Sequence, residues 1–184
     1  MESETEPEVE GSLIDDHILI SNSEMRQQLE LKGYGEESCG NFYLCYFEAL
    51  HLLYLGKLKL SHRGRPVNFD RMMEKSSRAS GEALIKFLIY RDLRTRGYVV
   101  KEGFGFGADF RVYERGGFGE KGARYLIFGM SEGKQEKIGA LQKKIGEMTQ
   151  MGKEPIIAVV ERRGEVIYYR ITGITFRPNR CDTL

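Results

Sequence analysis

Apolar residues in the second half of the chain recur first at helical and then at alternating spacing. Residues 80–98 have the helical pattern, with Gly97 as a typical C-terminal stop. The side chains expected to face inward from this helix are Leu84, Phe87, Leu88 and Leu93. Runs of β-branched and aromatic residues then predict strands at 98–104, 108–114, 124–130, 155–161 and 165–176. A second amphipathic helix is predicted at 133–152, with Ile138, Leu141, Ile145 and Met148 on its apolar face.

The first half of the chain mixes short extended segments with helices. Ser23 is a candidate helix cap and Gly33 a candidate helix stop. Gly56 is a candidate helix stop after a densely apolar stretch, and the centre of this stretch suits a buried helix. The elements predicted here are a short strand pair or extended stretch at 12–21, a helix at 21–33, a loop at 33–41 and a buried helix at 47–53.

A polar stretch with Gly64, Pro66 and two serine clusters separates the halves, and we place the domain boundary near residues 75–80. The predicted organisation is an acidic tail at 1–11, an N-terminal domain at 12–76 and a C-terminal domain at 80–184. The fold class is α+β: a small N-terminal α/β domain, then a C-terminal domain with a mixed sheet flanked by helices.

Charge and cysteine content exclude several classes of protein. The 184 residues carry 28 basic and 27 acidic side chains, a net charge of +1, so no global field attracts nucleic acid. Three cysteines without CxxC or Cys/His spacing indicate neither a disulfide framework nor a zinc site, and we expect no metal and no cofactor. The chain has no apolar run near the roughly 20 residues of a membrane span and no signal peptide, which predicts a cytoplasmic protein.

The glycines at 103, 105 and 107 resemble a nucleotide-binding loop. Phosphate loops lead directly into a helix, whose free N–H groups hold the anion. Here the alternating strand pattern of residues 108–114 follows instead. A hairpin or bulged turn is therefore the favoured interpretation.

Two polar residues lie at the ends of predicted elements. Tyr113 ends a strand between Arg111 and Arg115, and Lys153 lies between a helix and a buried strand. Composition alone explains the tyrosine as a half-packed strand residue and the lysine as a cation favoured by the helix dipole.

The segment "LIYRDLRTRGYVVKEGFGFGADFRVYERG" connects them, because it resembles the hallmark segment of archaeal tRNA-intron (tRNA-splicing) endonucleases. The similarity continues through "RYLIF" and "GKEPIIAVVERRGEVIYYRITGITF", and more faintly through "YFEALHLLYLGKLKL" near the N-terminus. The resemblance implies a nuclease-like C-terminal domain and assembly in twos or fours. It also implies metal-free cleavage of precursor tRNA at a bulge-helix-bulge motif, leaving a 2′,3′-cyclic phosphate and a 5′-hydroxyl.

In that family a tyrosine is the general base, a histidine the general acid and a lysine stabilises the charged transition state. The tyrosine falls on Tyr113 and the lysine on Lys153. The histidine position, three residues before the tyrosine of "RYLIF", is Gly122, in a loop about one residue short. The histidines of this chain, His17, His51 and His62, all belong to the N-terminal half.

Because Gly122 cannot donate a proton, we interpret the chain as the structural subunit of an α2β2 heterotetramer whose catalytic partner supplies the complete site. Two alternatives stay open. One is a self-sufficient endonuclease that uses Tyr113 and Lys153 with another acid, such as Lys121, Arg124 or water. The other is an RNA-binding module without nuclease function.

The resemblance also indicates contact surfaces. An acidic loop that inserts into the opposing dimer maps to Glu161 and Glu165, although Arg162 and Arg163 depart from its acidic character. Tyr168 and Tyr169 belong to a C-terminal strand expected to pair subunits. The candidate RNA-binding cations are Arg111, Arg115, Lys121, Arg124, Lys153 and Arg177. A second basic loop, containing His62, Arg63 and Arg65, could contact RNA or the partner subunit.

Overall fold

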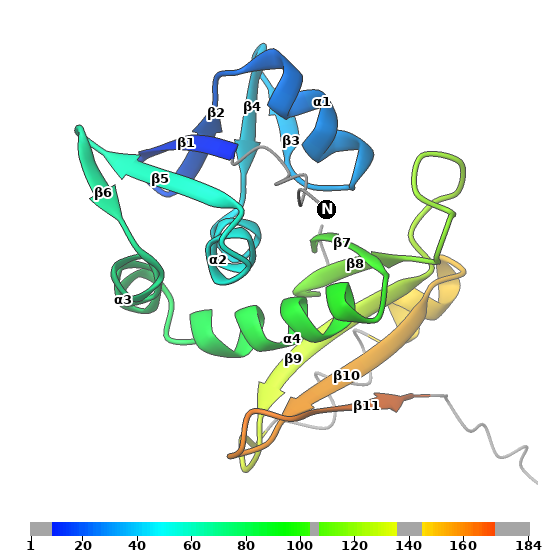
Figure 1. The fold of residues 1–184 in the computed structure, drawn as a ribbon. Helices are drawn as coiled ribbons and strands as arrows, with labels where there is room; N and C mark the ends of the chain where they lie inside the picture. Colours follow the sequence, from blue (N-terminus) through cyan, green and yellow to red (C-terminus); the bar gives the residue numbers. More distant parts are fainter. Residues whose placement is uncertain (1–8, 104–106, 136–144, 172–184) are drawn as a thin grey trace, which may run out of the picture.

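Two mixed β-sheets lie on either side of a helical layer in the computed structural model of the chain (Figure 1), which describes residues 9–103, 107–135 and 145–171. One sheet comes from the N-terminal half and the other from the C-terminal half. The helices between them pack on each other as well as on the sheets. This arrangement confirms the predicted α+β class.

The N-terminal sheet has the order β3-β4-β2-β1-β5-β6, and only β1 and β5 run parallel. Its strands are β1 (Val9–Ile14), β2 (His17–Ile20), β3 (Glu36–Ser38), β4 (Asn41–Leu44), β5 (Leu58–His62) and β6 (Arg65–Val67). The helices of this half are α1 (Ser23–Leu31), α2 (Tyr46–Tyr54) and α3 (Phe69–Ala79). Strand β1 alternates buried and exposed residues, so one face of the sheet packs on α2 and the other faces outward.

Several local features of this half differ from expectation. Strand β1 begins at Val9, inside the expected acidic tail. The N-cap of α1 is Asn22 rather than Ser23, because the Asn22 side chain accepts hydrogen bonds from two backbone N–H groups of the first turn. The expected loop at 33–41 contains β3, which pairs with β4 across a tight turn at Cys39 and Gly40. The polar stretch that we read only as a boundary contains β6 and α3.

The C-terminal half begins with α4 (Ala83–Thr95) and continues into a sheet of order β11-β10-β9-β8-β7. Its strands are β7 (Val99–Glu102), β8 (Phe110–Tyr113), β9 (Tyr125–Ser131), β10 (Glu154–Val160) and β11 (Val166–Arg170). Strands β9 and β10 are parallel, and the other neighbours are antiparallel. The parallel pair requires a crossover, and residues 145–150 of that crossover are helical, as predicted. Ile138 and Leu141 lie outside the described residues.

Helix α4 lies between the two sheets, and Gly97, with a φ of +85°, follows its C-cap Arg96 and stops the helix as predicted. Phe87 and Leu93 are buried as expected. Leu84 is 52% exposed, so the prediction that it faces inward is wrong. The inward stripe of the helix runs instead through Ala83, Phe87 and Tyr90, one residue away from Leu84.

The two halves share one core. Phe47 of α2 lies edge-to-face on Phe110 of β8, with ring centroids 5.1 Å apart, and 5.0 Å from the ring of Tyr90 on α4. All three rings are almost fully buried. Burying each such aromatic side chain contributes about 1.5–3 kcal/mol, so this contact holds the C-terminal sheet firmly against the N-terminal half.

Candidate active site

Strand directions bring Tyr113 and Lys153 to one edge of the C-terminal sheet. Strand β8 is antiparallel to β9, and β9 is parallel to β10. The end of β8 therefore meets the beginnings of β9 and β10, where Tyr125 pairs with Val112 on one side and Glu154 on the other. Tyr113 and Lys153 each adjoin this row of paired residues.

Gly122 lies against the amine of Lys153. A Cβ atom built on Gly122 would be 3.4 Å from the Lys153 Nζ, which donates a hydrogen bond of 2.6 Å to the carbonyl oxygen of Ala123. The position that the resemblance assigns to the general acid thus faces the lysine at van der Waals distance. It offers no side chain that could donate a proton.

Tyr113 is half-buried and held by an aromatic contact within the loop that follows it. Its ring meets Phe118 edge-to-face, with centroids 5.1 Å apart. Hydrogen bonds from Gly117 N to the Glu114 carbonyl and from Lys121 N to the Gly117 carbonyl, both 2.9 Å, close the loop on itself. The loop is therefore compact and carries Gly122 back toward β9.

Phe118 also lies near a buried ion pair, formed by Lys101 and Glu48. The Lys101 Nζ lies 5.6 Å from the Phe118 ring centroid and 3.8 Å from Oε1 of Glu48, and it also donates to the carbonyl oxygen of Gly35. Glu48 accepts hydrogen bonds from Gly35 N (3.0 Å) and Cys45 N (2.9 Å). Burial raises the pKa of Glu48 and lowers the pKa of Lys101, while each charge opposes the shift of the other. The N-terminal half thereby braces the sheet edge that carries Tyr113.

The arginines predicted to bind RNA are mostly engaged within the chain. Arg111 pairs with Glu36 at 3.0 Å and donates to the carbonyl of Glu102. Arg124 contacts two carboxylates, one on Glu114 and one on Glu154 at 2.8 Å.

The remaining predicted cations differ in their surroundings. Arg115 lies over the ring of Tyr98, 5.4 Å from its centroid. Lys121 is exposed, and Arg177 lies outside the described residues. The role of all these cations in RNA binding stays a prediction.

The three histidines lie in the N-terminal half, on β2, α2 and β5. His51 is buried, with Nδ1 3.2 Å from the Tyr34 hydroxyl and its ring against Tyr90. Burial, followed by the charges of Arg94 and Arg91, lowers its pKa to about 4. The His62 Nδ1 donates to the carbonyl oxygen of Leu13. The side chains of His51 and His62 therefore have structural contacts within the N-terminal half.

The glycine-rich segment connects β7 to β8 and does not open a helix. Gly103 N donates to the carbonyl of Asp109 at 2.8 Å, and a Cβ on Gly103 would lie 1.9 Å from the Ala108 carbonyl oxygen. Glycine is required there because the two chain segments touch. The hairpin interpretation of this segment agrees with these contacts, although Gly105 lies outside the described residues.

The two tyrosines predicted to form an interface point in different directions. Tyr168 packs toward α4 and donates to Asp92 at 2.7 Å, whereas Tyr169 is 52% exposed. Glu161 and Glu165 close the β10–β11 turn, where Glu161 N donates to the Glu165 carbonyl at 2.9 Å.

The described part of the chain has no group of three or more His, Cys, Asp or Glu residues placed to hold a metal ion. Among the same residues, no helix is long and apolar enough to cross a membrane.

Sequence reasoning missed Phe118, Lys101 and Glu48. The signal for Glu48 was visible, because a lone carboxylate within the apolar run 47–53 needs a buried partner. No local pattern marked Lys101 or Phe118, since their importance depends on contacts between the two halves.

The fold and this sheet edge define a two-domain protein of the tRNA intron endonuclease class. Residues 9–73 match the model for the tRNA intron endonuclease N-terminal domain, and residues 83–168 match that for the tRNA intron endonuclease catalytic C-terminal domain.

Curated relatives are similar to this chain over nearly its whole length. A tRNA-splicing endonuclease from Methanothermobacter thermautotrophicus is 34% identical over 90% of this chain and 98% of its own length. That from Thermococcus onnurineus is 30% identical over 91% and 98%, and that from Methanococcus maripaludis 30% over 89% and 93%. The chain belongs to the tRNA-splicing endonuclease family.

Proposed function

We propose that this chain is the structural subunit of a tRNA-splicing endonuclease that excises introns from precursor tRNA at bulge-helix-bulge motifs. The single observation that carries the proposal is Gly122 facing the Lys153 amine where a proton donor is needed.

The reaction requires three functions at one phosphodiester. A base removes the proton of the 2′-hydroxyl, the 2′-oxygen forms a new bond to phosphorus, and the bond from phosphorus to the 5′-oxygen breaks. The departing 5′-oxygen must then receive a proton, and the reaction leaves a 2′,3′-cyclic phosphate and a 5′-hydroxyl. Tyr113 would supply the base and Lys153 the fixed cation, but Gly122 supplies no acid.

The substitutes considered from the sequence are poorly suited to replace the acid. The guanidinium of Arg124 is bound by two carboxylates, and arginine does not give up its proton in proteins. Lys121 is exposed within the loop, and its side chain forms no hydrogen bond or ion pair with the described residues that would fix it near Lys153. A loss of about 10²–10⁴-fold in rate is expected when a positioned acid is missing.

In the proposed assembly, two copies of this chain combine with two copies of a homologous subunit that has the histidine. Tyr169 and Ile167, which are 52% and 38% exposed on the edge strand β11, support such pairing, as does the charged β10–β11 turn. In the assembled enzyme, this chain would hold the catalytic subunits in place and contact the precursor tRNA.

The test is the mass and composition of the complex purified from the native source. Stoichiometric amounts of this chain and a histidine-containing homologue would support the proposal. A complex that contains this chain alone and cleaves the RNA would overturn it.

A further inference from the structure

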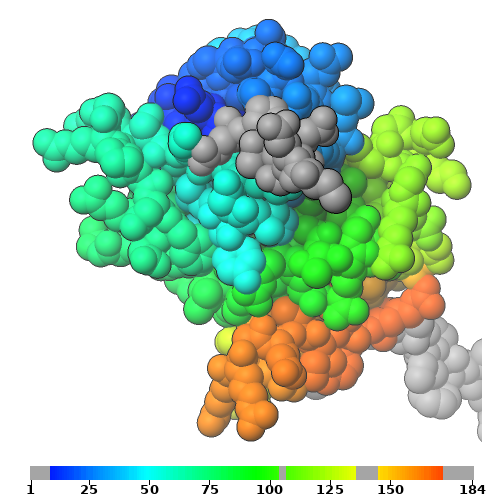
Figure 2. Space-filling view, viewed as in Figure 1, coloured from blue at the N-terminus to red at the C-terminus, as the bar shows by residue number. Residues whose placement is uncertain are grey.

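The β5–β6 hairpin projects from the N-terminal sheet at the opposite end of the molecule from residues 114–124 (Figures 1 and 2). Arg63 at its turn has a φ of +50°, and Arg63 and Arg65 are both exposed. The His62 Nδ1 hydrogen bond to the Leu13 carbonyl, 3.0 Å long, ties the base of the turn to β1. The hairpin therefore presents two arginines from a fixed base.

The charges of these arginines are not neutralised within the described residues. Neither Arg63 nor Arg65 forms an ion pair there, in contrast to Arg111 and Arg124 at the other end of the molecule. Asp15 lines a hollow beside Arg63 without pairing with it. Unpaired arginines at a fixed turn favour a polyanionic partner.

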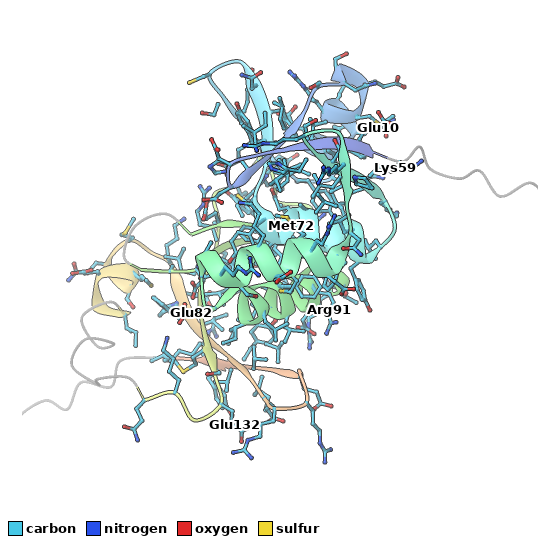
Figure 3. All side chains as sticks on the ribbon, turned by 90° about the vertical axis from the view of Figure 1, so that its left-hand side faces the viewer. Glu10, Lys59, Met72, Glu82, Arg91 and Glu132 are labelled. Carbon is cyan, nitrogen blue, oxygen red and sulfur yellow. The ribbon has the colours of Figure 1, made fainter. Side chains whose placement is uncertain are left out.

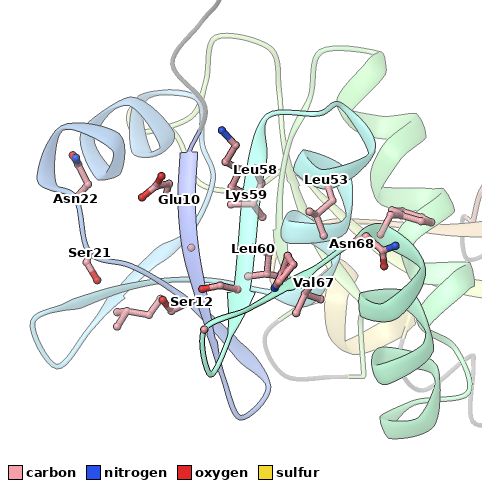
Figure 4. Close-up of a pocket in the computed structure, with 16 residues that line it drawn as sticks. Glu10, Ser12, Ser21, Asn22, Leu53, Leu58, Lys59, Leu60, Val67 and Asn68 are labelled. Atoms are coloured by element: carbon pink, nitrogen blue, oxygen red, sulfur yellow. The ribbon is translucent and has the colours of Figure 1, made fainter.

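A groove of about 850 Å³ adjoins the hairpin and crosses β1 and β5 toward the start of α3, with an apolar floor that includes Leu60 and Phe69 (Figure 4). Its polar lining includes Ser12, Ser21, Asn22, Ser61 and Asn68. Asn22 and Asn68 are the N-caps of α1 and α3, so the positive ends of two helix dipoles border the groove. Glu10, the acidic residue of the lining, is the cross-strand neighbour of Lys59 (Figure 3).

We propose that the β5–β6 turn and this groove form a second RNA contact surface, which binds the backbone of precursor tRNA outside the cleavage motif. Arginine, hydroxyl and amide groups are the ones that contact phosphate and ribose oxygens. The hairpin lies at the other end of this chain from the sheet edge of Tyr113 and Lys153, so the two surfaces would contact different parts of a bound RNA. This inference rests on the proposed function, because it takes precursor tRNA as the substrate.

The test measures RNA binding by the full chain in fluorescence anisotropy at several salt concentrations. The two probes are a complete precursor tRNA and a minimal hairpin that contains only the bulge-helix-bulge. The double variant Arg63→Asn/Arg65→Gln removes both charges, and asparagine tolerates the positive φ at residue 63. The matched controls are the single variants Arg65→Gln and Arg78→Gln, since Arg78 is also an exposed arginine of the N-terminal half.

We expect the double variant to bind precursor tRNA about tenfold more weakly, with the slope of log affinity against log salt reduced by about 2. Its binding to the minimal hairpin should not change, Arg65→Gln should have an intermediate effect, and Arg78→Gln should bind both probes like the wild type. Unchanged binding of precursor tRNA, or an equal loss for both probes, would overturn the second surface and leave the proposed function intact. If the wild-type chain bound neither probe, the second surface would be overturned, while the composition of the native complex would still decide the proposed function. Gel filtration of each variant mixed with the homologous subunit identifies the other occupant: a double variant that binds precursor tRNA like the wild type but no longer co-elutes with that subunit would make the surface a protein contact instead.

Discussion

A Cβ atom on Gly122 would lie 3.4 Å from the Lys153 Nζ, and apart from Gly122 and its two chain neighbours no other atom of the described residues lies within 4 Å of that position. The backbone of Gly122 also has no positive φ that would exclude a larger residue. Gly122 therefore has room for a Cβ atom at the position that the resemblance assigns to the general acid.

Restoring an imidazole there should restore activity. We predict that Gly122→His increases single-turnover cleavage of a bulge-helix-bulge RNA by about 10²–10⁴-fold over the wild-type chain. Gly122→Ala is the control, because it fills the same space without a titratable group. Equal rates for the histidine and alanine variants would show that the missing imidazole does not limit this chain.

The buried pair of Lys101 and Glu48 should dominate the stability of the contact between the two halves. Lys101→Met leaves the Glu48 carboxylate buried without its cation, which typically costs about 3–5 kcal/mol in the free energy of unfolding. Arg78→Ala, which removes the exposed pair with Glu74, should cost less than about 1 kcal/mol. Denaturant titrations measure both, and a comparable small cost for the two variants would contradict the bracing role of Lys101.

His51 should make the fold sensitive to acid. Its pKa is lowered from 6.5 to about 4 by burial, so below pH 6.5 the unfolded chain takes up a proton that the folded chain resists. Stability should fall by about 3 kcal/mol as the pH falls from 6.5 to 4, because each pKa unit corresponds to about 1.4 kcal/mol. In His51→Phe, denaturant titrations should show a shallower decrease over the same window. An unchanged pH dependence in this variant would assign the effect to other groups.

The tyrosines of β11 should separate stability from assembly. Tyr168→Phe removes the hydrogen bond to Asp92 and should lower stability by about 1–3 kcal/mol, with the mass of the complex unchanged. Tyr169→Ser changes an exposed ring and should lower the mass of the complex with little effect on stability. Mass photometry measures the mass of the complex, and thermal denaturation measures stability. A smaller complex for Tyr168→Phe and a less stable fold for Tyr169→Ser would show that the strand pairs through its other face.

The sequence predicted those elements whose apolar spacing is regular. Helix α4 with its stop at Gly97, the strands of the C-terminal half and the β1–β2 pair all follow from such spacing. It did not predict β6, which is short and mostly exposed, or α3, whose apolar stripe of Phe69, Met72 and Met73 is narrow and surrounded by polar residues. Leu84 shows the same limit, since periodicity alone cannot place the centre of an inward stripe to one residue.

For the candidate site, resemblance gave the three positions, and the strand directions explain why Tyr113 and Lys153 lie at the same sheet edge. The connection from Glu48 through Lys101 and Phe118 to Tyr113 could not be predicted, because it depends on the packing of two sheets that are distant in sequence. Similarly, Arg111 and Arg115 on either side of Tyr113 were predicted to bind RNA, and only the structure pairs Arg111 with Glu36.

The most direct test of the account is cleavage of a bulge-helix-bulge RNA by the purified chain, first alone and then mixed with its histidine-containing homologue. Gly122 predicts no appreciable cleavage by the chain alone and efficient cleavage by the mixture, with 2′,3′-cyclic phosphate and 5′-hydroxyl ends. Rapid cleavage by the chain alone, abolished by Tyr113→Phe or Lys153→Ala, would contradict the proposal that it is a structural subunit.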